Sequence, residues 1–124
     1  MHLCDAFDEY VVNDIDRNKI KMLKNNLKVY EKSLNYVFPY MMDFLQIKPF
    51  KTEMLIICPP WGGINIAAYS HSNLDEIMLP KLSDTLSHAL KFSHNILLQM
   101  PKNVSITNLI KIIAKLNINT TFSL

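Results

Sequence analysis

The sequence predicts an α/β fold, in which a mostly parallel sheet is covered by helices on both faces. Short apolar runs typical of buried strands alternate with segments of helical periodicity. The chain has 124 residues, of which 49% are hydrophobic and 19% charged, enough to bury a continuous core in one domain. No apolar run approaches the ~20 residues that cross a membrane. We therefore predict one compact, soluble, intracellular domain over residues 1–124, with no membrane partner.

The first half of the chain predicts a strand, a helix and an extended piece. The β-branched run from Tyr10, YVVNDID, predicts a short strand that ends in acidic residues. From Arg17 to about Lys32, apolar residues recur at steps of three and four and predict an amphipathic helix. The following YVFPYMMDF predicts a short extended piece, which Pro39 limits to a sheet edge or ends early.

The second half predicts two strands, helical turns, a helix and a final strand. EMLIIC is apolar enough for a buried parallel strand. Helical turns run from Leu74 to Leu90 around Pro80, and HNILLQM predicts the next strand. SITNLIKIIAKL predicts a helix with Ser105 as its N-cap, and INTTF could start a last strand.

Three polar features follow predicted strands. They are Asp14, Asp43 and the loop Cys58–Gly63, written CPPWGG. Ligands of parallel sheets bind in the crevice beyond the carboxyl ends of the strands, so these features are expected to share one crevice. A carboxylate such as that of Asp14 could there accept hydrogen bonds from ribose hydroxyls. Alternatively, Asp14 and Asp16 are acids favoured by the positive end of the helix dipole.

The CPPWGG loop holds the only tryptophan and the only two glycines of the chain. Pro59 and Pro60 stiffen the exit from the strand, while Gly62 and Gly63 allow the chain to turn at once. Trp61 is therefore expected on a rigid, exposed turn, where its indole could stack on a planar and especially a cationic ligand. The alternative is that the indole anchors the core.

Four lysines lie on the solvent side of the first predicted helix: Lys21, Lys24, Lys28 and Lys32. They could follow a phosphate backbone, or they could simply solvate the helix. The net charge of +2 and the pI of about 8.5 fall short of the strongly basic character of a dedicated nucleic-acid binder. Charge therefore permits contact with RNA without requiring it.

Neither the histidines nor the cysteines predict a metal site. His71, His88 and His94 lack the spacing of metal ligands. Cys4 and Cys58 lie far apart in sequence, which suggests no disulfide framework and fits a reducing compartment. We expect no metal in this protein.

A family resemblance rests on ordered segments of the chain. DAF, NDIDRNKIKMLKNNLKVY, MMDF, IICPPWGG and NILLQMPKN come in the order and approximate spacing of trimethylguanosine synthases, and the resemblance extends from about Leu3 to Asn103. It implies a Rossmann-like class I S-adenosylmethionine-dependent methyltransferase fold. It also implies transfer of methyl groups from S-adenosylmethionine to the exocyclic N2 of the 7-methylguanosine cap of small nuclear and nucleolar RNAs. A monomer acting in the nucleus, with the cytoplasm as a second location, is expected.

The resemblance also implies roles for individual residues. On the cofactor side, Asp14 would hold the ribose and Asp43 would approach the adenine amino group. Asp5 and Cys58 would complete the cofactor contacts.

On the substrate side, the resemblance implies that Trp61 stacks on 7-methylguanine and that Asn26 contacts this base. Pro59 and Pro60 would shape the acceptor pocket. The residues expected to support transfer directly are Cys58, Pro59, Pro60 and Trp61. Because a sulfonium methyl can be displaced directly, neither a covalent intermediate nor a metal is required.

The sequence departs from the family pattern at several places. Here DAF runs directly into DEYVVNDID, where the family has a glycine-rich loop and a helix. Cys58 stands where the family usually has serine, and both ends of the chain are shorter. These departures leave open a non-catalytic cap-binding or partner-binding relative. A methyltransferase acting on another planar amine such as adenine also stays open, because a turn of two prolines and an aromatic residue at a strand end suits that chemistry generally.

Overall fold

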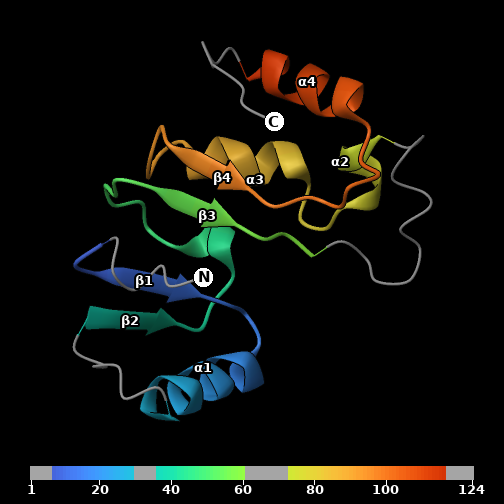
Figure 1. The fold of residues 1–124 in the computed structure, drawn as a ribbon. Helices are drawn as coiled ribbons and strands as arrows, with labels where there is room; N and C mark the ends of the chain where they lie inside the picture. Colours follow the sequence, from blue (N-terminus) through green and yellow to red (C-terminus); the bar gives the residue numbers. More distant parts are fainter. Residues whose placement is uncertain (1–6, 30–35, 61–72, 117–124) are drawn as a thin grey trace. The chain divides into compact units, whose positions relative to one another are not determined.

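The computed structural model describes residues 7–29, 36–60 and 73–116 and divides the chain into two compact units (Figure 1). The first unit is Met1–Lys48 and the second is Pro49–Leu124, and each is described here by itself. Both contain helices and a small parallel sheet, which confirms the mixed helix and strand composition that the sequence predicts. The predicted INTTF strand lies outside the described residues, and the prediction of one domain stays a prediction.

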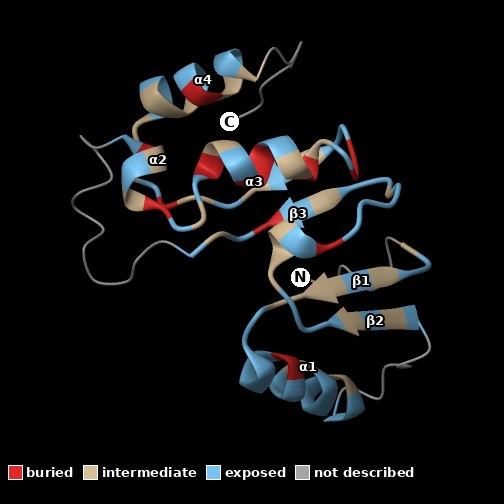
Figure 2. Cartoon of the chain, turned by 180° about the vertical axis from the view of Figure 1, so that it is seen from behind, coloured by how far each residue is buried: buried red, intermediate tan, exposed pale blue. Residues whose placement is uncertain are grey.

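The first unit is built from two parallel strands joined through a helix. β1 (Tyr10–Asn13) is followed by α1 (Arg17–Val29) and then by β2 (Val37–Tyr40). The strands pair over their full length, with Tyr10 opposite Val37 and Asn13 opposite Tyr40. α1 lies beside this pair and buries Ile20 (Figures 1 and 2). A strand, crossover helix and parallel strand thus form one unit, as expected for an α/β protein.

Local side-chain contacts determine where the helices of this unit begin. α1 starts directly after Asp16, whose carboxylate accepts a hydrogen bond from the backbone N–H of Asn18 at 2.8 Å. Asp16 is therefore the helix-capping acid. A short 3-10 helix, η3 (Phe44–Gln46), follows β2 and is capped by Asp43. The sequence did not predict η3.

The described residues of the second unit form another parallel pair and three helices. β3 (Leu55–Ile57) pairs with β4 (Ile96–Leu98), with Leu55 opposite Ile96. The helices are α2 (Leu74–Ile77), α3 (Leu82–Ala89) and α4 (Ile106–Lys115). The predicted strands EMLIIC and HNILLQM are therefore present but shorter than their apolar runs.

The core of the second unit centres on α2 and α3. Leu74 and Leu82 are completely buried, and Leu86 and Ala89 continue the buried face of α3 at helical spacing (Figure 2). Each fully buried leucine contributes about 1.5–3 kcal/mol to stability. This packing joins α2 to α3, the two helices of the described part of the crossover between β3 and β4.

The N-caps of α2 and α4 agree with their sequences. Asn73 accepts a hydrogen bond from the N–H of Asp75 at 3.2 Å and caps α2. Ser105 accepts one from the N–H of Asn108 at 3.3 Å, which confirms its predicted role at the start of α4. The Asn108 side chain in turn accepts from the backbone N–H of Leu74 at 3.0 Å, so α4 is tied to the start of α2.

Within the described ranges, no helix is both long and apolar enough to cross a membrane.

Candidate functional site

Two acidic residues follow the strands of the first unit. Asp14 comes directly after β1, and Asp43 follows β2 after Met41 and Met42. Because β1 and β2 are parallel and in register, their carboxyl ends lie at the same edge. The structure therefore places Asp14 and Asp43 beyond one edge of one strand pair.

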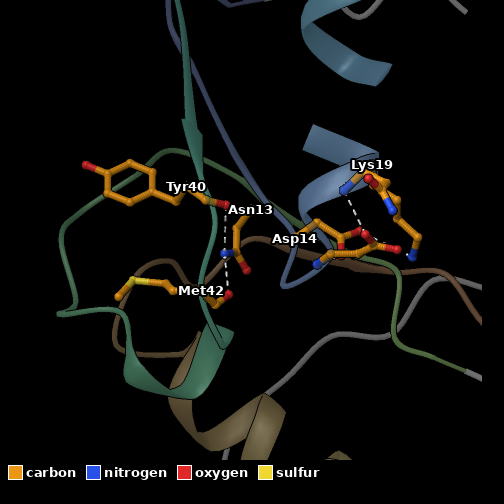
Figure 3. A network of polar contacts seen from close by, with 7 residues as sticks. Asn13, Asp14, Lys19, Tyr40 and Met42 are labelled. Carbon is orange, nitrogen blue, oxygen red and sulfur yellow. Dashed lines mark hydrogen bonds and ion pairs between the residues drawn. The ribbon is translucent and has the colours of Figure 1, made fainter. Parts of the chain in front are cut away.

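Asp14 is held by both backbone and side-chain contacts (Figure 3). Its backbone N–H donates to the carbonyl oxygen of Tyr40 at 3.2 Å, which extends the pairing with β2. Its Oδ1 accepts from the N–H of Asp16 at 2.9 Å, and its Oδ2 lies 3.4 Å from the Lys19 ammonium. The side chain remains 30% exposed. Because each carboxylate oxygen has two lone pairs, both can still accept a hydrogen bond from a ligand hydroxyl.

Asp43 has one oxygen engaged in capping η3. Its Oδ1 accepts from the backbone N–H of Leu45 at 3.0 Å, and its backbone carbonyl accepts from the N–H of Gln46 at 3.0 Å. The residue is half-buried, and within the described part of the chain no protein donor reaches its Oδ2. This oxygen can accept a hydrogen bond from an amino group.

Asn13 links the ends of the two strands and was missed from the sequence. Its Nδ2 donates to the carbonyl oxygens of Tyr40 at 3.3 Å and of Met42 at 2.8 Å (Figure 3). Asn13, which precedes Asp14, is thus hydrogen-bonded to Met42, which precedes Asp43. The available signal was an asparagine at the last position of a strand, where a side-chain amide can reach a neighbouring backbone.

The CPPWGG loop begins at the carboxyl end of β3 in the second unit. The backbone N–H of Gln99, which follows β4, donates to the carbonyl of Ile57 at 2.9 Å. The thiol of Cys58 donates to Gln99 Oε1, with sulfur and oxygen 3.0 Å apart. Cys58 and Pro60 are exposed and Pro59 is half-buried. Cys58 and Gln99 therefore meet where the two parallel strands end.

Gln99 was also missed, although the same reasoning that selected Cys58 applies to it. Each residue is the first after its strand, and parallel strands bring such residues together. The acids and the proline-rich loop were predicted from the sequence, but the amide at the neighbouring strand end was not.

The other predicted site residues lie in both units or outside the described residues. Asn26 is exposed on α1 in the first unit, which also holds Asp14 and Asp43. Asp5 and Trp61 lie outside the described residues. Cys58, Pro59 and Pro60 belong to the second unit.

The described ranges contain no group of three or more His, Cys, Asp or Glu side chains able to hold a metal ion.

Comparison with protein families supplies the decisive observation. The family model for RNA cap guanine-N2 methyltransferases matches residues 1–121, nearly the whole chain. The chain belongs to the RNA cap guanine-N2 methyltransferase family. The family assigned from the sequence motifs is thereby confirmed, and capped RNA is the substrate class that membership in this methyltransferase family implies.

The ends of β1 and β2 offer this cap methyltransferase family member hydrogen-bond acceptors suited to a nucleoside-like cofactor. Asp14 presents carboxylate lone pairs for hydroxyls, and Asp43 Oδ2 presents an acceptor for an amino group. Acidic residues at such strand ends commonly hold ribose in parallel α/β sheets. These residues fit an adenosine-bearing methyl donor.

Proposed function

We propose that this chain transfers a methyl group from S-adenosylmethionine to the exocyclic N2 of the 7-methylguanosine cap of small nuclear and nucleolar RNAs. Membership in the cap guanine-N2 methyltransferase family supports the reaction class. The observation that carries the proposal is the placement of Asp14 and Asp43 beyond the same edge of the β1–β2 pair. A Rossmann-like class I methyltransferase fold is proposed for the chain.

The proposed cofactor side consists of acidic residues from the first unit. Asp14 accepts hydrogen bonds from the ribose hydroxyls, and Asp43 accepts one from the adenine amino group through Oδ2. Asp5 is proposed to complete the cofactor contacts. S-adenosylmethionine, when bound, supplies an electrophilic methyl group on a sulfonium.

The proposed acceptor side is the start of the CPPWGG loop. The thiol hydrogen of Cys58 is directed at Gln99, so the sulfur lone pairs are left to accept weakly from the guanine N2–H. Pro59 and Pro60 have fixed φ angles and restrict where the loop can move. Holding N2 in line with the methyl group supplies most of the catalysis, because such orientation effects reach about 7–11 kcal/mol.

Recognition of the base is proposed for Trp61 and Asn26. The 7-methylguanine ring is cationic, so stacking on the indole would favour it over unmethylated guanine through a cation–π attraction of about 0.5–2 kcal/mol. Asn26, exposed on α1, supplies an amide for the polar edge of the base.

A second function is favoured by one observation. β1 begins at Tyr10, so only Asp8 and Glu9 stand between Phe7 and the strand, and the chain has no glycine other than Gly62 and Gly63. Glycine-rich turns before such crossovers allow a close backbone approach to a nucleotide cofactor. A cap-binding protein without transferase activity would retain Trp61 for the base and would not need a glycine-rich turn close to a cofactor.

Separate titrations with S-adenosylmethionine and a 7-methylguanosine cap analogue distinguish the two functions. The single Trp61 serves as the fluorescence reporter, and calorimetry detects binding away from it. The transferase requires binding of both ligands and methyl transfer to guanine N2. Binding of the cap alone supports the second function, and failure to bind either ligand contradicts both.

A Trp61→Ala variant tests the assignment of the base-binding side. It should lose affinity for the cap analogue while S-adenosylmethionine affinity stays within about twofold, since its stacking contribution of about 0.5–2 kcal/mol concerns the base alone. Trp61→Phe, which keeps an aromatic face, is the matched control and should retain part of the cap affinity. Equal loss of both ligands in Trp61→Ala would contradict the assignment.

We further propose that the protein acts as a monomer in the nucleus. Light scattering of the purified chain and imaging of a fluorescent fusion in a nucleated cell test these two points. A stable dimer, or exclusion of the fusion from the nucleus, would contradict them.

A further inference from the structure

Positive charge is concentrated on α1. The chain has thirteen Lys and Arg residues and eleven Asp and Glu residues, and α1 holds five of the cations and none of the acids. The remaining chain therefore carries eight cations against eleven acids. α1 is a positive pole in a protein whose net charge is only +2.

Four of these cations form a continuous row, named here the basic ridge: Arg17, Lys21, Lys24 and Lys28. They follow one another at steps of four, three and four residues. With 3.6 residues per turn and a rise of 1.5 Å per residue, they fall within an arc of about 60° and extend along about 16 Å of the helix. The helix thus presents the four cations on one side.

The basic ridge is exposed to solvent. All four residues are exposed, and Figure 2 shows most of α1 in the colour of exposed residues. Ile20, which is buried, lies just outside this arc, about 40° around the helix from Lys24, so the ridge borders the buried side of α1. Lys19 is about 200° around the helix from Arg17 and pairs with Asp14, so it belongs to the cofactor side instead.

The basic ridge destabilises the isolated helix. Like charges three or four residues apart repel one another, and Arg17 stands at the positive end of the helix dipole. In the described ranges no acidic side chain forms an ion pair with any of the four. A face needed only for solubility would gain more from mixed charges. An anionic ligand lying along the helix would relieve this repulsion.

We propose that the basic ridge binds the phosphate backbone of the RNA segment that follows the cap. This inference rests on the proposed function, because a capped RNA brings a string of phosphates to the protein with its base. A row of cations about 16 Å long can contact several successive phosphates of a single strand. Contacts to phosphates position RNA without reading its sequence, so the ridge would add affinity for any RNA body.

The salt dependence of binding tests this proposal. Association constants are measured by fluorescence anisotropy for a capped oligoribonucleotide, the same oligoribonucleotide without the cap, and a cap dinucleotide analogue. For single strands, the logarithm of the association constant falls with the logarithm of salt concentration by about 0.7 per neutralised phosphate. Four contacts therefore add a slope of about −2.8 for the capped oligoribonucleotide over that of the cap analogue.

The decisive variant is K21Q/K24Q/K28Q, which leaves only Arg17 in the ridge. Its added slope should fall to about −0.7. Between 50 and 200 mM salt, the affinity supplied by the RNA body should drop about 50-fold in the unmodified chain and only about threefold in the variant. Since the substitutions remove repulsion within α1, the variant is expected to fold at least as well, and circular dichroism verifies this.

Two control variants separate the basic ridge from general charge effects. K111Q/K115Q removes two exposed lysines from α4 and should leave the slope unchanged. K21R/K24R/K28R keeps the charges and should retain the steep salt dependence. Loss of slope in the α4 variant equal to that in the ridge variant would overturn the proposal.

The test also separates this proposal from the proposed function. If the unmodified chain binds and methylates the cap analogue but K21Q/K24Q/K28Q keeps the full slope, the basic ridge is refuted alone. If the chain ignores the cap analogue but binds the uncapped oligoribonucleotide with a steep slope that the variant lacks, the ridge stands and the cap function fails.

Discussion

The Asn13 amide predicts a measurable coupling between the two strand ends of the first unit. In Asn13→Ala, both hydrogen bonds from Nδ2 to the carbonyls of Tyr40 and Met42 are lost. A hydrogen bond contributes about 0.5–1.5 kcal/mol net, and the longer of the two, at 3.3 Å, belongs at the lower end of that range. The expected decrease in the free energy of unfolding is about 1–2 kcal/mol.

Asn13→Asp provides a sharper version of the same test. This substitution preserves size but replaces the donating amide with a carboxylate oxygen that would face two carbonyl oxygens. It should therefore destabilise the protein more than Asn13→Ala does. Asn25→Ala, at an exposed position on α1, is the matched control. It should raise the free energy of unfolding by a few tenths of a kcal/mol at most, because alanine is the better helix former.

Urea denaturation followed by circular dichroism measures these effects, and calorimetry measures S-adenosylmethionine binding in parallel. Because Asn13 tethers the segment before Asp43, both Asn13 variants should also bind the cofactor more weakly than the unmodified chain. If Asn13→Ala is as stable as the Asn25→Ala control, or if Asn13→Asp is the more stable of the two Asn13 variants, the reasoning is refuted.

Three further substitutions test other parts of the structure. Asp14→Ala would remove the proposed charge-assisted hydrogen bonds to ribose, worth about 1.5–3 kcal/mol, so calorimetry should show S-adenosylmethionine affinity reduced about 10- to 150-fold; an unchanged affinity would contradict the proposed role. Cys58→Ser keeps a donor to Gln99 and supplies a better acceptor for an amine, so single-turnover methyl transfer should be no slower, whereas a large loss of rate would count against the proposed contact. Ser105→Ala should lower the free energy of unfolding by about 1 kcal/mol through loss of the α4 N-cap, and an unaltered urea midpoint would show that the cap contributes nothing.

The order of strands and helices could be predicted because each element has a recognisable pattern among neighbouring residues. The β-branched run of β1, the helical periodicity of α1 and the serine before α4 each identify an element from neighbouring residues. Strand lengths were less accessible, since the apolar run EMLIIC continues on both sides of the paired residues Leu55–Ile57. Pairing, which ends a strand, depends on a partner far away in sequence.

In the candidate site, too, some features could be predicted from the sequence and others depend on contacts between distant residues. That Asp14 and Asp43 lie at one edge follows from parallel pairing, a general property of the predicted fold. The hydrogen bond from Asn13 to Met42 spans 29 residues and depends on the exact register of β1 and β2. The contact between Cys58 and Gln99 spans 41 residues and depends likewise on the register of β3 and β4. Neither register can be read from the local pattern of one strand.

For the basic ridge, the structure helps to choose between two interpretations that the sequence left open. The sequence allowed either a solvated helix face or a path for phosphates, with Lys32 as its last member. α1 begins at Arg17, as the sequence predicted, and helix geometry places this residue, which was not counted among the lysines, at the first position of the row. Lys32 lies outside the described residues. The exposure of all four members and the lack of acids in α1 favour the phosphate path.

The central claim is tested most directly by incubating the purified full chain with S-adenosylmethionine and a 7-methylguanosine-capped RNA and then identifying the methylated nucleosides by mass spectrometry. The account predicts a methyl group on the exocyclic N2 of the 7-methylguanosine, formed in proportion to enzyme and much reduced in Asp14→Ala. An RNA whose cap stays unmodified while S-adenosylmethionine and cap analogue both bind, or methylation at another position, would contradict it.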